Sequence, residues 1–165
     1  MNDSVSHRVL LRPAVIGDCR RLWEWRNEHA TREASFNTEY IPFKEHERWF
    51  ERKLTDPHMR ILIATDSHGC DIGYVRFDIS GGEAEISISI DQNERGKGYG
   101  IAVIKSGSEH LMTTVPVKRI VAHMKTENVA SAVVFERAGF VLKGYKQIAG
   151  VKACEMVYEP KPAEQ

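Results

Sequence analysis

A glycine-rich turn near the middle of the chain carries the residue types that bind phosphate. Residues 95–100 read Arg-Gly-Lys-Gly-Tyr-Gly, after a segment with the alternation of a strand and before one with the spacing of a helix. Glycines let backbone N–H groups approach a ligand closely, and the first turn of a helix presents unpaired amides and the positive end of its dipole to an anion. The turn therefore predicts a phosphate-binding site. The alternative is a tight turn whose glycines only relieve steric crowding.

Two common phosphate-binding motifs do not fit this turn. A Walker P-loop requires GxxxxGK followed by Ser or Thr, whereas here Gly98 is followed by Tyr99. A dinucleotide fingerprint requires GxGxxG after the first strand of a βαβ unit and an acidic residue about 20 residues later. This turn lies in mid-chain, its spacing is GxGxG, and position 120 is isoleucine. The sequence thus excludes a P-loop and disfavours a dinucleotide fold.

Hydrophobic periodicity predicts the elements that must position this turn. The clearest strand follows Gly81-Gly82, where apolar residues at 84, 86, 88 and 90 alternate with polar residues at 85, 87 and 89. Further strands are predicted at 8–12, 61–65, 72–78, 117–123, 140–145 and 151–158, and helices at 18–27, from 43 to about 56, after 100, and at 128–138. The order β-α-α-β-β-β-α-β-α-β-β predicts an α/β protein with a mixed sheet and helices on its faces.

Length and composition are typical of one soluble domain. The 165 residues are 42% hydrophobic and 28% charged, so we expect a single domain over 1–165, with its core at about 8–158 and a short tail at 160–165. The 23 basic residues balance the 23 acidic ones, which gives no net attraction to nucleic acid or anionic lipid. No apolar run approaches the roughly 20 residues that span a bilayer. We therefore expect neither a nucleic-acid nor a membrane partner.

The cysteines and histidines show no disulfide or metal-binding pattern. Cys19, Cys70 and Cys154 are odd in number and far apart, and the seven histidines show no HExxH or paired-ligand spacing. Widely spaced cysteines without a framework fit a reducing compartment. The sequence therefore predicts a cytoplasmic protein without a metal ion.

Two motifs in this order resemble those of the GCN5-related N-acetyltransferases. The coenzyme A motif of that family is Gln or Arg, two residues, Gly, one residue, then Gly or Ala after the fourth strand, and Arg95, Gly98 and Gly100 match it at that place. A second family element, an Asn with Ser or Ala before a helix that ends in Gly-Phe, matches residues 128–131 and 138–140. The resemblance implies the family's fold and acetyl-coenzyme A as cosubstrate.

The resemblance covers about residues 8–158 and implies where acetyl-coenzyme A lies. The cofactor would sit between the fourth and fifth strands, with its pyrophosphate on the amides of the glycine turn. The backbone around Ile88 and Ile90 would pair with the pantetheine and polarise the thioester carbonyl, because a fixed N–H stabilises the developing oxyanion. Asn128 and Ser131 would flank the thiol arm. The implied cofactor-binding residues are Ile88, Ile90, Arg95, Gly96, Lys97, Gly98, Tyr99, Gly100, Asn128 and Ser131.

Glu85 and His123 are the candidates for removing the proton of an amine acceptor, which is mostly protonated at neutral pH. Glu85 lies on the polar face of the fourth strand, where related ribosomal-protein acetyltransferases also carry a glutamate; the alternative is a solvated carboxylate. His123 ends the fifth strand and titrates near neutrality, and the alternative is a structural histidine. Many family members protonate the departing thiolate with a tyrosine where this chain has Phe135, which cannot donate a proton.

The two N-terminal helices resemble those of acetyltransferases that modify the 4-amino group of a UDP-linked dideoxy sugar in the pseudaminic acid pathway. Residues 25–27 read Trp-Arg-Asn, and residues 45–50 carry Glu-His and Trp-Phe pairs. The resemblance implies that Arg26 and His46 contact the diphosphate and that Trp49 offers an aromatic surface to the base or sugar. The alternative is that these residues only pack the helices together.

The sequence therefore predicts an acetyl-coenzyme A-dependent N-acetyltransferase for a small-molecule amine, the 4-amino group of a UDP-linked amino sugar. The alternative enzyme acetylates a protein N-terminus, as ribosomal-protein acetyltransferases do. A further alternative, which is not an enzyme, is a coenzyme A-binding module without turnover. Phe135 supports this alternative because it cannot donate a proton to the thiolate. The prediction includes no metal and allows a homodimer.

Overall fold

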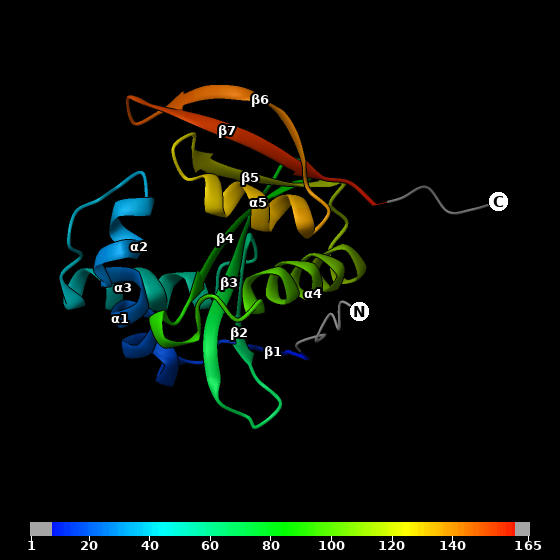
Figure 1. The fold of residues 1–165 in the computed structure, drawn as a ribbon. Coiled ribbons are helices and arrows are strands. Elements are labelled where there is room, and N and C mark those ends of the chain that lie inside the picture. Colours follow the sequence, from blue (N-terminus) through cyan, green and yellow to red (C-terminus); the bar gives the residue numbers. More distant parts are fainter. Residues whose placement is uncertain (1–7, 161–165) are drawn as a thin grey trace.

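A seven-stranded mixed sheet organises residues 8–160, the part of the chain that the computed structural model describes (Figure 1). Its order is β1-β2-β3-β4-β5-β7-β6, and every neighbouring pair is antiparallel except the parallel pair β4 and β5. The strands are β1 Leu10–Pro13, β2 Met59–Thr65, β3 Asp71–Ser80, β4 Glu83–Ile90, β5 Arg119–Lys125, β6 Val141–Ile148 and β7 Val151–Tyr158. The predicted mixed α/β fold is confirmed.

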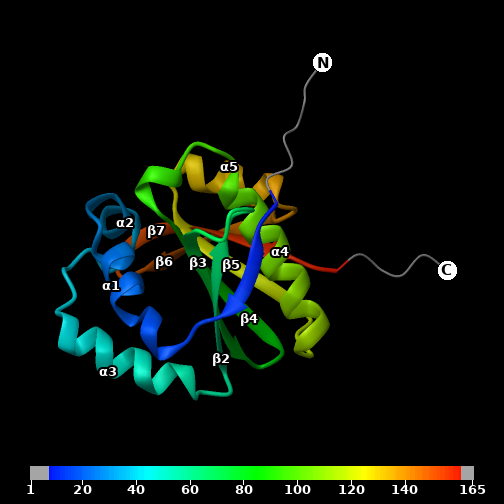
Figure 2. The same cartoon turned by 90° about the horizontal axis from the view of Figure 1, so that it is seen from below.

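Helices cover both faces of this sheet (Figure 2). The helices α1, α2 and α3 lie on one face, and α4 and α5 lie on the other. Their bounds are α1 Cys19–Asn27, α2 His29–Ala34, α3 Phe43–Leu54, α4 Tyr99–Thr114 and α5 Val129–Arg137, with short 3₁₀ turns η1 Ile16–Asp18 and η2 Gln92–Glu94. None of these helices is long and apolar enough to span a membrane.

The short helix α2 was not predicted from the sequence, which indicated two N-terminal helices where the structure has three. The chain leaves α1 at Glu28, whose ψ of 138° is not helical, and the side chain of Glu28 then accepts hydrogen bonds from the amides of Ala30 and Thr31. This side-chain cap starts a second helix directly after the first. Glutamate is not among the usual capping residues, so the break carries no common sequence signal.

Alternation along β4 gives the sheet an apolar and a polar face. Ala84 and Ile86 are buried in the core beneath α4 and α5, whereas Glu85 and its alternate neighbours 87 and 89 face α1 to α3. The strand register places Arg76 of β3 beside Ser87 on this side of the sheet. We call the side of the sheet that carries Glu85, Ser87, Ser89, Arg76 and His123 the polar face.

The strands β4 and β5 separate after a short stretch of pairing (Figure 1). Three residue pairs join them, and the last is Glu85 opposite Val121. Beyond this pair, β4 continues along β3 to Ile90, while β5 continues along β7 to Lys125. The two strands therefore bound a wedge-shaped opening, and the glycine turn follows β4 at its wide end.

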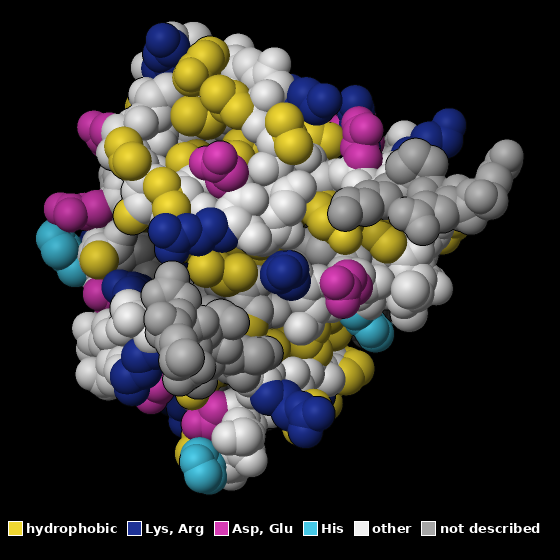
Figure 3. Space-filling model, turned by 45° about the vertical axis from the view of Figure 1, so that its right-hand side comes forward, with side chains coloured by type: hydrophobic (Ala, Val, Ile, Leu, Met, Phe, Trp, Pro, Cys, Tyr) yellow, Lys and Arg dark blue, Asp and Glu magenta, His cyan; other side chains and the backbone are white. Residues whose placement is uncertain are grey.

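The strand β6 lies at one edge of the sheet and exposes hydrophobic side chains. Val141 and Tyr145 are 58% and 57% exposed, and Leu142 is 47% exposed. Figure 3 shows hydrophobic side chains gathered along the top of the molecule, over β6 and β7. The predicted homodimer stays a prediction, and this edge is the surface on which we would look for it. Apart from Pro160, the predicted tail at 160–165 lies outside the described residues.

Candidate active site

The glycine turn has the backbone conformation that its residues predicted. Gly96 and Gly98 have φ values of +75° and +87°, in the left-handed region that favours glycine, and Gly98 is the N-cap of α4. The amides of the first turn of this 16-residue helix therefore point out of its N-terminus. At Gly100 a Cβ would make an ordinary van der Waals contact of 3.4 Å with Cγ1 of Val134 on α5, so packing does not require glycine there. Phosphate binding by the turn stays a prediction.

The cationic side chains of the turn are engaged by protein carboxylates. Arg95 donates from Nη2 to Oε2 of Glu28 at 2.7 Å and to Oγ1 of Thr31 at 3.0 Å, and Lys97 pairs with Glu94 at 3.0 Å. Burial alone would raise the pKa of Glu28, but the hydrogen bonds from Arg95 and Thr31 lower this pKa to about 2. Arg95 therefore ties α2 to the glycine turn. The role of its side chain in holding the cofactor stays a prediction.

The backbone of β4 is turned toward the wedge-shaped opening at the positions expected to bind pantetheine. The carbonyl of Ile90 accepts a hydrogen bond of 3.0 Å from Nε of Arg95, so the polar backbone groups of Ile90 point away from β3. Backbone groups of a strand alternate in direction, and those of Ile88 therefore point the same way. Because β5 has separated by this point, an extended ligand can pair with this edge of β4.

Asn128 and Ser131 form the N-cap of α5, which begins directly after β5 and beside the opening. Oδ1 of Asn128 accepts a hydrogen bond of 3.2 Å from the amide of Ser131. Phe135, one turn further along α5, is 5% exposed and packs edge-to-face on Phe140 with ring centroids 5.1 Å apart. The structure therefore places the two cap residues next to the opening and Phe135 in the core.

The two candidate bases lie side by side on the polar face. Nδ1 of His123 is 3.5 Å from Oε2 of Glu85, across the point where β4 and β5 separate. Nε2 of the same ring is 2.8 Å from Oε2 of Glu155, the residue opposite His123 on β7. The His123 side chain is 7% exposed and that of Glu85 is 54% exposed. Sequence reasoning missed Glu155, whose only signal is the pairing of β5 with β7.

Three buried polar atoms without hydrogen-bond partners lie between the polar face and the N-terminal helices. They are Nη1 of Arg26, Nε of Arg76 and Oγ of Ser89; a fourth such atom in residues 8–160 belongs to Ser108 on α4. Nη2 of Arg26 donates to the carbonyl of Asn37 at 3.1 Å, so this guanidinium is only partly satisfied. Burial lowers the pKa of Arg26, and the nearby charge of Arg76 lowers it further. Nε of Arg76 also has an ion-pair contact of 3.9 Å with Oδ2 of Asp78, which is too long for a hydrogen bond, so an anionic ligand would add the hydrogen-bond acceptor that each guanidinium lacks.

His46 and Trp49 lie in the same region but make different contacts. Nε2 of His46 is 3.0 Å from the carbonyl of Cys19, so this nitrogen carries the hydrogen. Burial lowers the pKa of His46 despite that hydrogen bond, which leaves the ring neutral and its Nδ1 without a proton to donate. Trp49 covers the guanidinium of Arg76, with Cζ 5.1 Å from the ring centroid. The diphosphate role of His46 stays a prediction, and Arg76 is the donor that sequence reasoning missed.

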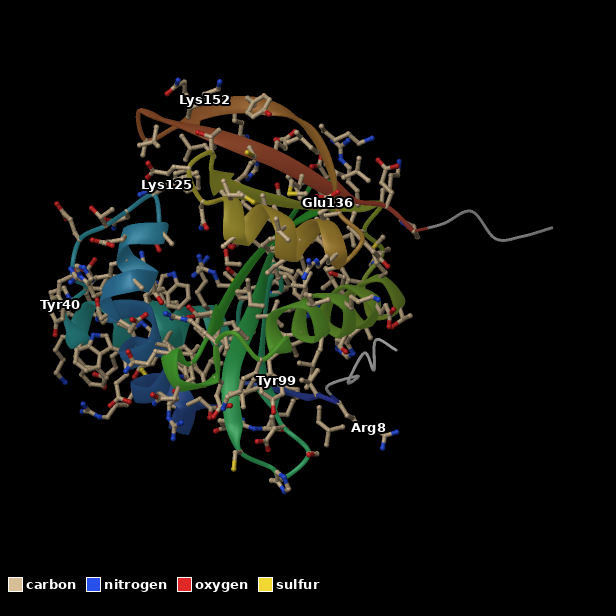
Figure 4. All side chains as sticks on the ribbon, in the orientation of Figure 1. Arg8, Tyr40, Tyr99, Lys125, Glu136 and Lys152 are labelled. Atoms are coloured by element: carbon tan, nitrogen blue, oxygen red, sulfur yellow. The ribbon has the colours of Figure 1, made fainter. Side chains whose placement is uncertain are left out.

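The helix α2 is fastened over the wide end of the opening. Lys125, the last residue of β5, is 8% exposed and donates from Nζ to the carbonyl of Glu33 at 2.7 Å (Figure 4). With the Arg95–Glu28 pair, this bond holds α2 between the glycine turn and β5. The helix α2 therefore covers the region where the glycine turn and the polar face meet.

A pocket of about 250 Å³ opens between α1 and η2, beside the glycine turn. Its walls carry the carboxylates of Glu24, Glu28 and Asp91 and the guanidinium groups of Arg21 and Arg95. Glu28 is paired with Arg95, and Asp91 accepts a hydrogen bond of 2.9 Å from Nε1 of Trp25. Among residues 8–160, no group of three or more His, Cys, Asp or Glu side chains could hold a metal ion.

Comparison with known proteins identifies the family. The family described as "Acetyltransferase (GNAT) domain" matches residues 8–141. Spermidine N(1)-acetyltransferase of Vibrio cholerae is 26% identical over 148 residues, which cover 88% of this chain and 83% of that protein.

Solved structures share the fold. The spermidine N-acetyltransferase of Vibrio cholerae in complex with CoA and spermine has a TM-score of 0.83 at 24% identity, covering 92% of this chain and 95% of that one. Aminoglycoside acetyltransferase AAC(6')-Ib in complex with coenzyme A has a TM-score of 0.80 at 22% identity, with coverage of 92% and 95%. Their names point to spermidine and aminoglycosides, and not to nucleotide sugars or ribosomal proteins. The chain therefore belongs to the GNAT acetyltransferase family and is an acetyl-coenzyme A-dependent N-acetyltransferase.

Proposed function

We propose that this enzyme acetylates the 4-amino group of a UDP-linked dideoxy amino sugar in the cytoplasm. The observation that carries the proposal is the pair of partly unsatisfied guanidinium groups of Arg26 and Arg76 beside the polar face. A buried donor without an acceptor costs about 1–3 kcal/mol, and a diphosphate would supply acceptors to both groups. Trp49, which already covers Arg76, offers an aromatic surface next to them.

The same charges disfavour a polyamine in this part of the site. A polyamine would bring further positive charge beside Arg26 and Arg76, whose mutual repulsion already lowers the pKa of Arg26 after burial has lowered it. A polyamine is nevertheless the second candidate, because a relative is named for spermidine and the carboxylates that line the pocket beside the glycine turn outnumber its arginines by three to two. Acetylation of a protein N-terminus is the remaining alternative.

The polar face supplies the proton acceptor for this reaction. Glu85 and His123 receive the proton of the acceptor ammonium, and the free amine nitrogen then attacks the thioester carbonyl carbon. The amide bond forms as the carbon–sulfur bond breaks, and the electron pair leaves with sulfur. Amides of β4 near Ile88 stabilise the oxyanion, while those of the glycine turn hold the pyrophosphate.

Thiol release on a panel of amines tests the proposal. The panel contains a UDP-linked 4-amino sugar, spermidine, an aminoglycoside and a peptide with a free N-terminus. We expect turnover of the UDP-sugar and inhibition by UDP. Turnover of spermidine or the peptide without any effect of UDP would overturn the nucleotide-sugar assignment.

Substitution of the arginines tests the same assignment through the site itself. Arg26→Gln and Arg76→Gln should each raise the Michaelis constant for the UDP-sugar by about tenfold to a hundredfold, because each removes a charge-assisted hydrogen bond of about 1.5–3 kcal/mol. The Michaelis constant for acetyl-coenzyme A should stay unchanged. Arg60→Gln is the matched control, since Arg60 is an exposed arginine of β2 that donates hydrogen bonds to the carbonyls of Pro57 and Met59.

A further inference from the structure

We propose that Glu155 is a positioning residue that fixes the ring of His123 for uptake of the acceptor's proton. The inference rests on the proposed acetyl transfer to an amine, but on no particular amine. Glu155 comes from β7, beyond the two strands that bound the opening, and it touches the site only through His123.

The hydrogen bond between the two residues fixes which nitrogen of the ring is free. An ionised carboxylate only accepts hydrogen bonds, so Nε2 of His123, 2.8 Å from Glu155, carries the hydrogen. Nδ1 is then the basic nitrogen, and it faces Glu85 at 3.5 Å at the narrow end of the opening. Without Glu155 the ring would be free to change tautomer or turn. The carboxylate of Glu155 thus sets the direction of the lone pair on Nδ1 of His123.

The groups around the ring stabilise the charge that it gains. Glu85 of β4 and Glu155 of β7 lie on its two sides, and Asp78 of β3 is the residue opposite Glu85. Lys146 of β6 approaches Oε2 of Glu155 at 3.5 Å, the distance at which a cation helps to hold that carboxylate. The hydrogen bond from His123 lowers the pKa of Glu155, which keeps it ionised at neutral pH.

On β5 itself, Val121 is apolar, and Lys125 is bonded to the carbonyl of Glu33 on α2. The ring therefore has a carboxylate on each side as its charged contacts among the described residues.

The protons of the reaction balance through this arrangement. The acceptor ammonium gives one proton to Nδ1 of His123, and this proton passes to solvent through the exposed carboxylate of Glu85. The nitrogen lone pair forms the bond to the acetyl carbon, and the carbon–sulfur bond breaks. The second proton of the attacking nitrogen goes by way of water to the thiolate, giving the amide and free coenzyme A. Phe135 has no part in these transfers.

The experiment compares Glu155→Gln with Glu83→Gln across pH, using whichever amine of the panel the wild type turns over. Glu83 lies on the same side of β4 and makes a cross-strand ion pair with Arg119 at 2.7 Å, so its variant controls for loss of such a pair. Glu155→Gln should lower kcat/KM about tenfold to a hundredfold at pH 7 and move the acidic limb of its pH profile to lower pH, because the imidazolium has lost one stabilising carboxylate. Glu83→Gln should change neither.

Nuclear magnetic resonance of the His123 imidazole nitrogens gives a readout that needs no acetyl transfer. The wild type should show hydrogen on Nε2, and Glu155→Gln should give a mixture of tautomers. An acidic limb and a tautomer that do not respond to Glu155→Gln would overturn the positioning role. If Glu155→Gln fails to fold, Glu155→Asp, which keeps the charge but shortens the reach, should shift the same two readouts in the same direction. Absence of turnover in the wild type would instead contradict the proposed function, while the nitrogen spectra would still decide the role of Glu155.

Discussion

The cofactor side of this site is built from backbone groups, whereas the acceptor side is built from side chains. On the cofactor side, the edge of β4 and the turn before α4 present backbone groups, and glycines at φ values of +75° and +87° shape them. On the acceptor side, the polar face and helices α1 to α3 present side chains, with three buried polar atoms left unpaired. Backbone recognition suits a cosubstrate common to a family, whereas side chains can change with the acceptor.

The two sides also differ in how far apart in the sequence their residues lie. The glycine turn is formed by six consecutive residues, although the Arg95 side chain also bonds Glu28 and Thr31. Arg26 of α1 lies near enough to Arg76 of β3 for the charge of Arg76 to lower its pKa, and His123 and Glu155 meet because β5 pairs with β7. A substitution in the turn should therefore act on cosubstrate binding alone, and one on the polar face should act on the acceptor or its proton.

The largest effect on ligand binding should come from a side chain at Gly98. Gly98→Val forces a β-branched residue to a φ of +87° and shifts the amides at the start of α4. We expect the dissociation constant for acetyl-coenzyme A, measured by calorimetry, to rise about a hundredfold or more, which corresponds to about 2.7 kcal/mol.

Gly69→Val is the matched control for backbone strain. Gly69 has a φ of +80° in the turn between β2 and β3, and a Cβ there meets nothing within 4 Å. It should lose a similar amount of stability but keep cosubstrate affinity. Wild-type affinity in a folded Gly98→Val protein would show that the turn does not hold the pyrophosphate.

The sequence predicted the elements of the cofactor side, because its signals are local. Alternation located β4 and the glycines located the turn before α4. Asn128, which was expected next to the thiol arm, is the cap of α5, and its contact with the cosubstrate stays a prediction. The catalytic roles of Glu85 and His123 also stay predictions, and nothing in the sequence placed Glu85 within 3.5 Å of His123.

The acceptor side was harder to predict, because its contacts join distant segments. The polar face holds Arg76 opposite Ser87 through the β3–β4 register, and His46 bonds the carbonyl of Cys19, 27 residues before it. The sequence alone gives periodicity within each segment but not which segments meet. For the same reason a histidine expected to bind phosphate is a neutral, buried side chain, and Arg76 was not considered.

The largest effect on the chemical step should come from a substitution at Glu85. Glu85→Gln keeps the shape of the side chain but removes its ability to share the acceptor's proton with His123. A positioned acid–base group contributes about 10²–10⁴-fold, so turnover at pH 7 should fall by about that range, with a milder loss at high pH where free amine is abundant. The Michaelis constant for acetyl-coenzyme A should not change, and Glu83→Gln is again the control. A loss below about threefold would assign the role to His123 or to water.

A smaller effect is expected where the two sides are joined, at Glu28. Its folded pKa of about 2 lies below the ordinary value of 4.5, so its contribution to stability is complete above about pH 4.5 and is lost as the pH falls toward 2. Glu28→Gln should lower the free energy of unfolding by about 1 kcal/mol at pH 7, after allowance for the partly exposed Arg95.

Urea unfolding at a series of pH values measures this effect. The difference between wild type and Glu28→Gln should shrink as the pH falls from 4.5 toward 2. Glu94→Gln, which breaks the local pair with Lys97, should show no such trend. A difference in the free energy of unfolding that stays constant over this range would mean that the Glu28–Arg95 contact does not hold α2 against the glycine turn.

The smallest effect should come from introducing a tyrosine at position 135. If the polar face governs the proton that limits turnover, Phe135→Tyr adds a hydroxyl where none is needed, and turnover should change less than about threefold. The hydroxyl would enter a site that is 5% exposed and packed against Phe140, so the free energy of unfolding should fall by about 1–3 kcal/mol unless it finds a partner. Single-turnover kinetics and urea unfolding measure the two quantities. A rise in turnover above tenfold would show that protonation of the thiolate limits this enzyme, and the cofactor side would then control the chemistry as well as the binding of its cosubstrate.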